Sequence, residues 1–340
     1  MSVVTIVGAG MMGSALVFPA RENGNTVRLV GTVLDDEIID TCIRTGRHPK
    51  FVEDFPSGVE YYKFSEFAAA LPGTDFVICG VSSFGVDWFA DAVLPKLGKI
   101  PVLSVTKGMF DTEDGELLTY PEYWNKRVPQ AEICAVGGGC TSYELVAKDP
   151  TVVAYCGANR ATLEKMRAAM QTEYYHIWLT DDVRGVESAV ALKNAYAMGV
   201  TLMIGINERK NGEGAKQHYN SQAALFAQGA KEMRKLVHYF GGTDDSLDIG
   251  IGDLYVTVFS GRTRLIGTLL GRGLSLEDAL KQLEGITLES NVVAERVGRA
   301  LRKQAAAGKI SLAEYPVMEL VYGILTEKAP ADIPWDAIVA

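Results

Sequence analysis

The first half of the chain alternates short apolar runs with stretches in which apolar residues recur at helical spacing. The short runs are rich in β-branched residues and predict buried strands, whereas the longer stretches predict helices. The predicted strands are Val3–Val7, Val27–Val30, Phe76–Cys79, Val102–Val105, Ile133–Val136, Val152–Tyr155 and His176–Leu179. The predicted helices include Met12–Glu22, Asp36–Arg44, Val86–Leu94 and Thr162–Met170. Such alternation is typical of a mostly parallel sheet with helices on both faces.

Beyond Asp181-Asp182 the strand pattern ends and only helical patterns follow. A long apolar helix is predicted over residues 186–206. Further predicted helices are Asn220–Tyr239, Leu247–Ser260, Thr263–Leu270, Leu276–Leu283, Val292–Ala306 and Tyr315–Leu325. We therefore predict an α/β protein, with a Rossmann-type doubly wound sheet over residues 1–183 and an all-helical substrate domain over residues 184–340. The expected substrate site is a cleft between the two domains.

Composition narrows the partners. The 340 residues are 48% hydrophobic and carry a net charge of −9, which disfavours nucleic acid and anionic membrane surfaces. We find no apolar run of the roughly 18 residues that a membrane span needs, and no signal-peptide pattern. The five cysteines lack metal-type spacing and the four histidines do not cluster. These observations predict a cytoplasmic protein with reduced thiols and without a metal site.

The most informative motif is Gly8-Ala9-Gly10-Met11-Met12-Gly13, directly after the first predicted strand. Gly8 permits a tight turn, Gly10 allows close approach of a pyrophosphate, and Gly13 allows close packing of the next helix. We expect residues 8 and 10–13 to bind a dinucleotide; a purely structural glycine turn is the alternative. Thr32 lies where an acidic residue would hold the ribose of NAD, whereas Asp35 and Asp36 come slightly later and are interpreted as the start of the next helix. The motif therefore leaves NAD and NADP both open.

Lys193 lies inside the apolar helical run Ser188–Met198. Burial disfavours the ammonium form and so prepares an amine to exchange a proton with a substrate hydroxyl. The alternative is a lysine whose amine reaches the surface. Asp253 and Thr257 are spaced to share one helix face, where the carboxylate would orient Lys193.

Two further basic residues occupy informative positions. Lys107 follows the strand Val102–Val105, and the carboxyl ends of parallel strands line the ligand crevice. Arg262 stands at the start of a predicted helix, where a guanidinium and backbone N–H groups together suit a phosphate. An ordinary surface location is the alternative for each.

Together these motifs resemble the NAD(P)-dependent glycerol-3-phosphate dehydrogenase family, most closely an archaeal-type branch. The similarity runs over nearly the whole chain in order and spacing. The similar motifs are the glycine motif, Ser104–Gly108, Ala191–Asn194, Gly252-Asp253-Leu254 with Thr257, and Gly261-Arg262-Thr263. In addition, Gly46-Arg47-His48-Pro49 looks like the family's histidine-containing segment. The resemblance implies a small phosphorylated substrate, NAD or NADP with a preference for NADP, a homodimer, and a part in glycerophospholipid metabolism.

The resemblance also implies roles by position. Lys193 resembles the general base, and Lys107, Asn194, Asp253 and Thr257 resemble substrate-site residues. The remaining positions resemble substrate- and cofactor-binding residues: Gly139, Thr141, Arg262 and Thr263 for the substrate, and Phe84, Lys107, Arg262 and Glu289 for the cofactor. The implied reaction is reversible hydride transfer between nicotinamide and dihydroxyacetone phosphate or glycerol 3-phosphate.

Two departures from the family pattern concern the substrate. Cys140 stands where proline is usual, and Thr263 replaces an asparagine that would offer two amide donors. They leave open another polyol phosphate, such as a four-carbon one, or a hydroxy acid. A protein of a different class, a catalytically silent redox sensor that binds NAD(P) and a partner, is a further alternative.

Overall fold

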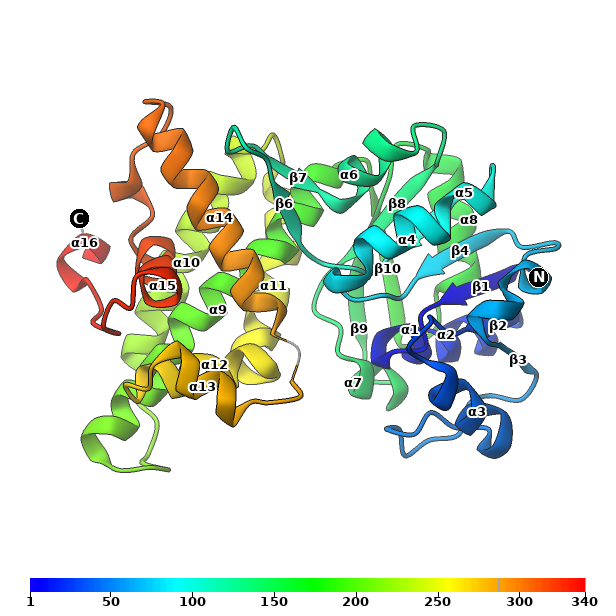
Figure 1. Cartoon of the computed structure of the whole chain (residues 1–340), viewed down its shortest axis with the longest axis horizontal. Coiled ribbons are helices and arrows are strands. Elements are labelled where there is room, and N and C mark those ends of the chain that lie inside the picture. Colours follow the sequence, from blue (N-terminus) through cyan, green and yellow to red (C-terminus); the bar gives the residue numbers. More distant parts are fainter. Residues whose placement is uncertain (287, 340) are drawn as a thin grey trace. The chain divides into compact units, whose positions relative to one another are not determined.

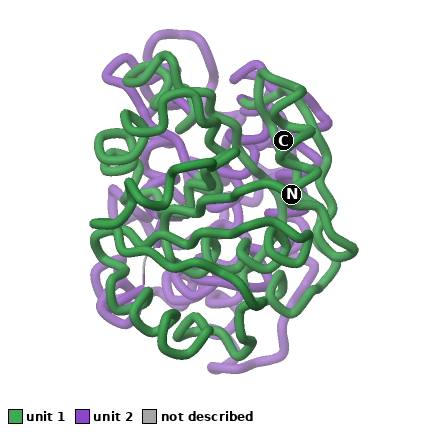
Figure 2. Tube along the Cα trace, turned by 90° about the vertical axis from the view of Figure 1, so that its right-hand side faces the viewer, with its two compact units in different colours: residues 1–107, 120–183 green, residues 108–119, 184–340 purple. Residues whose placement is uncertain are grey.

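The computed structural model describes residues 1–286 and 288–339, which divide into two compact units. The first unit contains residues 1–107 and 120–183, and the second contains residues 108–119 and 184–340 (Figure 2). The segment 108–119 therefore belongs to the second unit, whereas the sequence analysis placed it in the first domain.

A twisted sheet with helices around it forms the first unit (Figure 1). Its described strands follow the order β10-β9-β8-β5-β4-β1-β2-β3, and neighbours are parallel except for β8 and β9. The strands are β1 (Val3–Val7), β2 (Thr26–Val30), β3 (Val59–Tyr62), β4 (Phe76–Cys79), β5 (Val102–Ser104), β8 (Ile133–Gly137), β9 (Thr151–Cys156) and β10 (Tyr175–Thr180). This order places β1 and β4 side by side, which is where a doubly wound sheet binds its ligand.

The helical segments of the first unit follow the strands closely. They are α1 (Met11–Ala15), α2 (Val17–Glu22), α3 (Asp36–Thr45), η1 (Phe64–Ala70), η2 (Ser83–Gly85), α4 (Val86–Ala92), α5 (Leu94–Leu97), α6 (Tyr120–Arg127), α7 (Ser142–Val146) and α8 (Arg160–Met170). The predicted helix Met12–Glu22 is divided into α1 and α2 at Leu16. Pro19 explains the break, because it has no N–H to donate to the carbonyl of Ala15.

The strand β3 was not predicted from the sequence. This strand lies at the edge of the sheet, and its residues are half-buried apart from the exposed Glu60, so it lacks the buried apolar run that marks the inner strands. Parallel pairing with β2, from Val27↔Val59 to Val30↔Tyr62, places it.

Helices make up most of the second unit. They are α9 (Val183–Asn211), α10 (Tyr219–Tyr239), α11 (Asp244–Phe259), α12 (Arg262–Gly271), α13 (Leu276–Gln282), α14 (Glu289–Ala306), η3 (Leu312–Glu314), α15 (Pro316–Thr326) and α16 (Trp335–Val339). The unit also contains the antiparallel hairpin β6 (Met109–Asp111) and β7 (Leu117–Thr119), so the prediction of an all-helical domain was incomplete.

The helix α14 explains why the hairpin belongs to this unit. Arg299 makes two hydrogen bonds to the carboxylate of Asp111, at 2.6 and 3.0 Å, and Arg296 donates to the carbonyl of Met109. Met109 and Leu117 are buried in the hydrophobic core that the helices share. Figure 1 shows α14 alongside β6. These contacts join segments nearly 190 positions apart, so no local pattern could reveal them.

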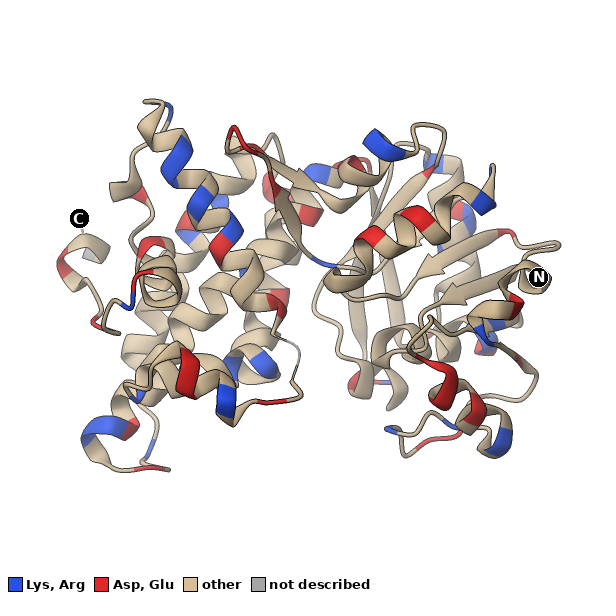
Figure 3. Ribbon diagram, viewed as in Figure 1, with Lys and Arg blue, Asp and Glu red and all other residues tan. Residues whose placement is uncertain are grey.

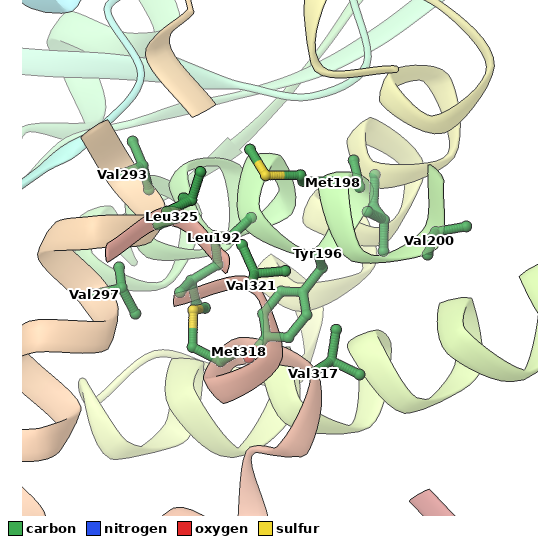
Figure 4. Close-up of a cluster of buried hydrophobic side chains, with 14 of the residues drawn as sticks. Leu192, Tyr196, Met198, Val200, Val293, Val297, Val317, Met318, Val321 and Leu325 are labelled. Carbon is green, nitrogen blue, oxygen red and sulfur yellow. The ribbon is translucent and has the colours of Figure 1, made fainter. Parts of the chain in front are cut away.

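The central element of the second unit is α9. It is long and apolar enough to cross a membrane by length and composition, which the sequence analysis did not expect of any segment. However, 89% of its most apolar stretch is buried within the protein. Figure 4 shows side chains of α9, including Leu192 and Tyr196, packed against those of neighbouring helices, such as Val297 and Met318. We therefore interpret α9 as a core helix. Figure 3 shows acidic and basic residues interspersed on the helices of both units.

Candidate active site

The glycine motif forms the turn between β1 and α1. Gly8 has a φ of 111°, and a Cβ there would lie 2.8 Å from the carbonyl carbon of Gly80. A Cβ on Gly13 would lie only 2.1 Å from the oxygen of Gly8. A Cβ on Gly10, by contrast, would meet no atom closer than the oxygen of Gly80 at 4.0 Å. Two glycines are therefore required by packing, while the space beside Gly10 fits the close approach of a phosphate group.

Four other expected cofactor residues belong to the first unit and lie in the turn itself or in the segments that follow β2 and β4. Met11 and Met12 are half-buried in the first turn of α1. Phe84, in the segment after β4, is largely exposed. Thr32 follows β2, and its hydroxyl donates to the carboxylate of Asp35 at 2.8 Å.

Lys107 follows β5, and its Nζ donates a hydrogen bond of 2.9 Å to the carbonyl oxygen of Gly138. This bond joins the ends of two neighbouring strands, β5 and β8. The segment after β8 contains Gly139 and Thr141, whose hydroxyl donates to Glu144 at 2.6 Å. The structure thus places Lys107 beside the segment expected to bind substrate.

Lys193 is buried on α9 and meets two residues of α11. Its Nζ donates to Oδ1 of Asp253 at 2.5 Å and to the hydroxyl of Thr257 at 2.9 Å. The Thr257 hydroxyl in turn donates to the carbonyl of Asp253 at 2.7 Å, which leaves its oxygen lone pairs facing the amine. Lys193 and Asp253 are 8% and 2% exposed. The two side chains therefore form a buried ion pair.

Further expected residues of the second unit lie at helix ends. Arg262 begins α12 and Glu289 begins α14, and Nη2 of Arg262 lies 3.9 Å from Oε2 of Glu289. The side chain of Arg262 is half exposed, whereas Thr263 is buried. Asn194, next to Lys193, is half-buried.

Three residues near the glycine motif were not assigned to the site from the sequence. Gly80 packs against the motif, because a Cβ there would lie 2.9 Å from Cα of Gly13. Asp35 was interpreted as a helix-start residue, yet its side chain makes no capping bond to α3 and bonds to Ala9 instead. His48 is buried against the carbonyl of Ala9. Only the motif Gly46–Pro49 gave a signal for His48.

The fold, the glycine turn after β1 and the buried cluster of Lys193, Asp253 and Thr257 define a class: a two-domain, dinucleotide-dependent dehydrogenase that acts on an alcohol carbon. Comparison with known proteins makes this specific. Residues 3–163 match the family model for the NAD-dependent glycerol-3-phosphate dehydrogenase N-terminus, and residues 182–335 match that for its C-terminus. The chain belongs to the NAD-dependent glycerol-3-phosphate dehydrogenase family, as its sequence motifs predicted.

Individual relatives agree with this. The chain is 32% identical over 323 residues to an NADP(+)-dependent glycerol-3-phosphate dehydrogenase of Archaeoglobus fulgidus, covering 93% of this chain and 95% of that one. It is 25% identical to a glycerol-3-phosphate dehydrogenase [NAD(P)+] of Clostridium botulinum, with 96% and 94% covered. The crystal structure of glycerol-3-phosphate dehydrogenase from Coxiella burnetii has the same fold, with a TM-score of 0.81, 24% identity, and 99% and 98% of the two chains covered.

Proposed function

We propose that this chain catalyses reversible hydride transfer between NADP(H) or NAD(H) and dihydroxyacetone phosphate or glycerol 3-phosphate. The observation that carries the proposal is the buried Lys193–Asp253–Thr257 cluster, within a chain whose first unit has the dinucleotide-type glycine turn. A silent redox sensor has no use for a buried amine held in a fixed direction.

The nicotinamide supplies the hydride when it is bound. Lys193 handles the proton: in the reductive direction its ammonium donates to the developing alkoxide of the substrate, and in the oxidative direction the neutral amine accepts the hydroxyl proton. Asp253 and Thr257 hold Nζ in place through the two bonds above. Such proton transfer contributes roughly 10²–10⁴-fold to the rate.

The phosphate group is assigned to the start of α12. This helix follows Gly261, which has a φ of 89° and provides no side-chain cap for the first N–H groups. Unsatisfied N–H groups at a helix start, together with the half-exposed guanidinium of Arg262, suit a phosphate. Because the side chain of Thr263 is buried, we assign its contribution to its backbone N–H. Glu289 would hold Arg262 toward this position.

NADP is the preferred cofactor in this proposal. The relative from Archaeoglobus fulgidus is named as NADP(+)-dependent. In this chain the second residue after the end of β2 is the neutral Thr32, and Oδ2 of the nearby Asp35 accepts three hydrogen bonds from within the protein. A free carboxylate at this place would instead hold the ribose 2′-hydroxyl of NAD.

Initial rates on a substrate panel, measured with NADPH and NADH by nicotinamide absorbance, test the function. We expect the highest kcat/KM with dihydroxyacetone phosphate and NADPH. Higher kcat/KM with a four-carbon ketose phosphate would assign the chain to another polyol phosphate, as the departures at Cys140 and Thr263 allow. Turnover of unphosphorylated hydroxy acids alone would contradict the assigned phosphate site.

Three further properties belong to the same proposal. We propose that the enzyme acts in the cytoplasm, forms a homodimer, and supplies glycerol 3-phosphate for glycerophospholipid synthesis. Light scattering of the purified chain tests the dimer: a mass near 36.8 kDa would instead indicate a monomer.

A further inference from the structure

The peptide groups on both sides of Ala9, at the centre of the glycine motif, are held by side chains from other segments. The N–H of Ala9 donates to Oδ2 of Asp35 at 3.1 Å. The carbonyl oxygen of Ala9 accepts from Nε2 of His48 and from the hydroxyl of Ser14, both at 3.2 Å. Ala9 itself is fully buried. The turn thus has fixed partners for its backbone that the glycine pattern does not supply.

Asp35 joins this turn to the end of β2. Its Oδ2 accepts hydrogen bonds from the N–H and the hydroxyl of Thr32, each at 2.8 Å, as well as from Ala9. Three donors on one oxygen leave the carboxylate little rotational freedom. Asp35 stands directly before α3 but does not cap it, so its side chain serves the turn rather than the helix.

His48 holds the other side of the turn in a defined tautomer. The N–H of Lys50 donates to Nδ1 at 3.2 Å, so Nδ1 carries no proton and Nε2–H is the donor to Ala9. The ring is 2% exposed and packs against Phe51, with centroids 4.7 Å apart. Burial lowers the pKa of His48, which keeps the imidazole neutral in this tautomer at neutral pH.

We propose that Asp35 and His48 are positioning residues of the cofactor site, which aim the N–H groups of the glycine turn at the cofactor pyrophosphate. The reason is the planarity of the peptide group, in which C=O and N–H point in opposite directions. A carbonyl of Ala9 held toward His48 and Ser14 therefore directs the N–H of Gly10 away from them. Since no Cβ covers Gly10, that N–H lies beside the open space described above. This inference rests on the proposed function.

The hydrogen bonds of Asp35, His48 and Ser14 to Ala9, which we call the clamp, predict a selective effect on ligand binding. Ligands that carry the pyrophosphate, such as NADPH and ADP-ribose, depend on the direction of the N–H groups of the glycine turn. AMP has no pyrophosphate and does not depend on it. We expect His48→Leu to weaken ADP-ribose and NADPH binding about tenfold and to leave AMP binding unchanged. A tenfold loss corresponds to the net contribution of about one hydrogen bond. His48→Gln, which retains an N–H donor, restores most of the affinity.

Isothermal titration calorimetry of the whole chain with ADP-ribose and AMP is the decisive measurement, because it does not depend on turnover. Phe51→Leu is the matched control: it loosens the packing around His48 without removing a bond to Ala9. It should lower the Tm and keep the ratio of the two affinities. Ser14→Ala, which removes one hydroxyl, is a second variant that tests the clamp if His48→Leu does not fold.

The two titrations separate the possibilities. Selective loss of ADP-ribose affinity in the His48 and Ser14 variants supports the clamp. An equal loss for both ligands, no loss, or the same selective loss in Phe51→Leu overturns it. If the unmodified chain binds neither NADPH nor ADP-ribose, the proposed function itself fails.

Discussion

Nζ of Lys193 and Oδ1 of Asp253 lie 2.5 Å apart, although the residues are 60 positions apart in the chain and both are buried. A buried ammonium and a buried carboxylate are each costly to bring out of water, and each is tolerated here because the other is present. The pair therefore affects both the stability of the protein and the proposed proton transfer. These two roles can be tested separately.

Replacing Lys193 with alanine removes the proposed proton donor and acceptor. We expect kcat to fall on the order of 10²–10⁴-fold, with cofactor affinity retained, because the glycine turn is untouched. Steady-state kinetics and NADPH titration measure the two effects. Lys210→Ala, at the exposed end of the same helix, is the control and should keep the wild-type rate. A near wild-type kcat in Lys193→Ala would contradict the mechanism.

The stability of the pair should be strongly non-additive. Asp253→Leu leaves the buried ammonium without its carboxylate and should lower the free energy of unfolding by about 3–5 kcal/mol. In the double variant Lys193→Met with Asp253→Leu no charge remains, so we expect it to be more stable than Asp253→Leu. Denaturant unfolding of the wild type, Lys193→Met, Asp253→Leu and the double variant completes the double-mutant cycle. Additive losses would show that the two side chains act independently.

Two substitutions in the glycine motif separate an effect on folding from an effect on cofactor binding. Gly13→Ala places a Cβ against the oxygen of Gly8 and should lower the Tm by several degrees. Gly10→Ala meets no close protein atom, and its φ of −68° suits alanine, so folding should be preserved. The added methyl group should nevertheless weaken NADPH binding, since it occupies the space assigned to the pyrophosphate. Thermal unfolding and NADPH titration of both variants check this; unchanged NADPH affinity in Gly10→Ala would place the cofactor elsewhere.

Glu232 should make stability depend on pH. Its carboxylate is buried on α10 and accepts from Gln228 and from the N–H groups of Val317 and Met318 at the start of α15. Burial raises its pKa to about 7 from an ordinary value of 4.5. Between these values the folded state binds more protons than the unfolded state, so stability falls as pH rises through this window, by up to about 3 kcal/mol.

The comparison of wild type with Glu232→Gln isolates this effect, because glutamine does not titrate. Urea unfolding from pH 4.5 to 8 should show a wild-type stability that decreases relative to Glu232→Gln as pH rises. Glu277→Gln, an exposed carboxylate on α13, is the control and should follow the wild-type pH dependence. Parallel curves for wild type and Glu232→Gln would contradict the buried-acid interpretation.

The hairpin β6–β7 should depend on α14. Arg299→Ala removes two hydrogen bonds to the nearly buried carboxylate of Asp111, and we expect a loss of about 1 kcal/mol, small because Arg299 is half exposed. Hydrogen exchange should become faster at residues 109–119 and remain unchanged in β1. Reversing the pair, as Asp111→Arg with Arg299→Asp, should recover much of the protection. Equal exchange in wild type and Arg299→Ala would show that the apolar contacts alone hold the hairpin.

Local chemistry determined much of this protein. The β-branched runs and the glycine motif sufficed to predict the inner strands, the doubly wound sheet and the tight turn between β1 and α1, because each depends on residues within a few positions of one another. Lys193 stood out for the same reason, as a charge within an apolar helix. Local signals failed for the edge strand β3 and the hairpin β6–β7, whose places depend on partners distant in the chain.

Only the tertiary structure decided what the candidate residues touch. The ion pair of Lys193 with Asp253, the approach of Arg262 to Glu289, and the bonds of Asp35 and His48 to Ala9 join segments 26 to 60 positions apart. The sequence assigned Asp35 to a helix start because its type and place suit one. In the fold, the N–H of Ala9 and the end of β2 come within its reach, and hydrogen bonding is decided by such proximity rather than by order along the chain.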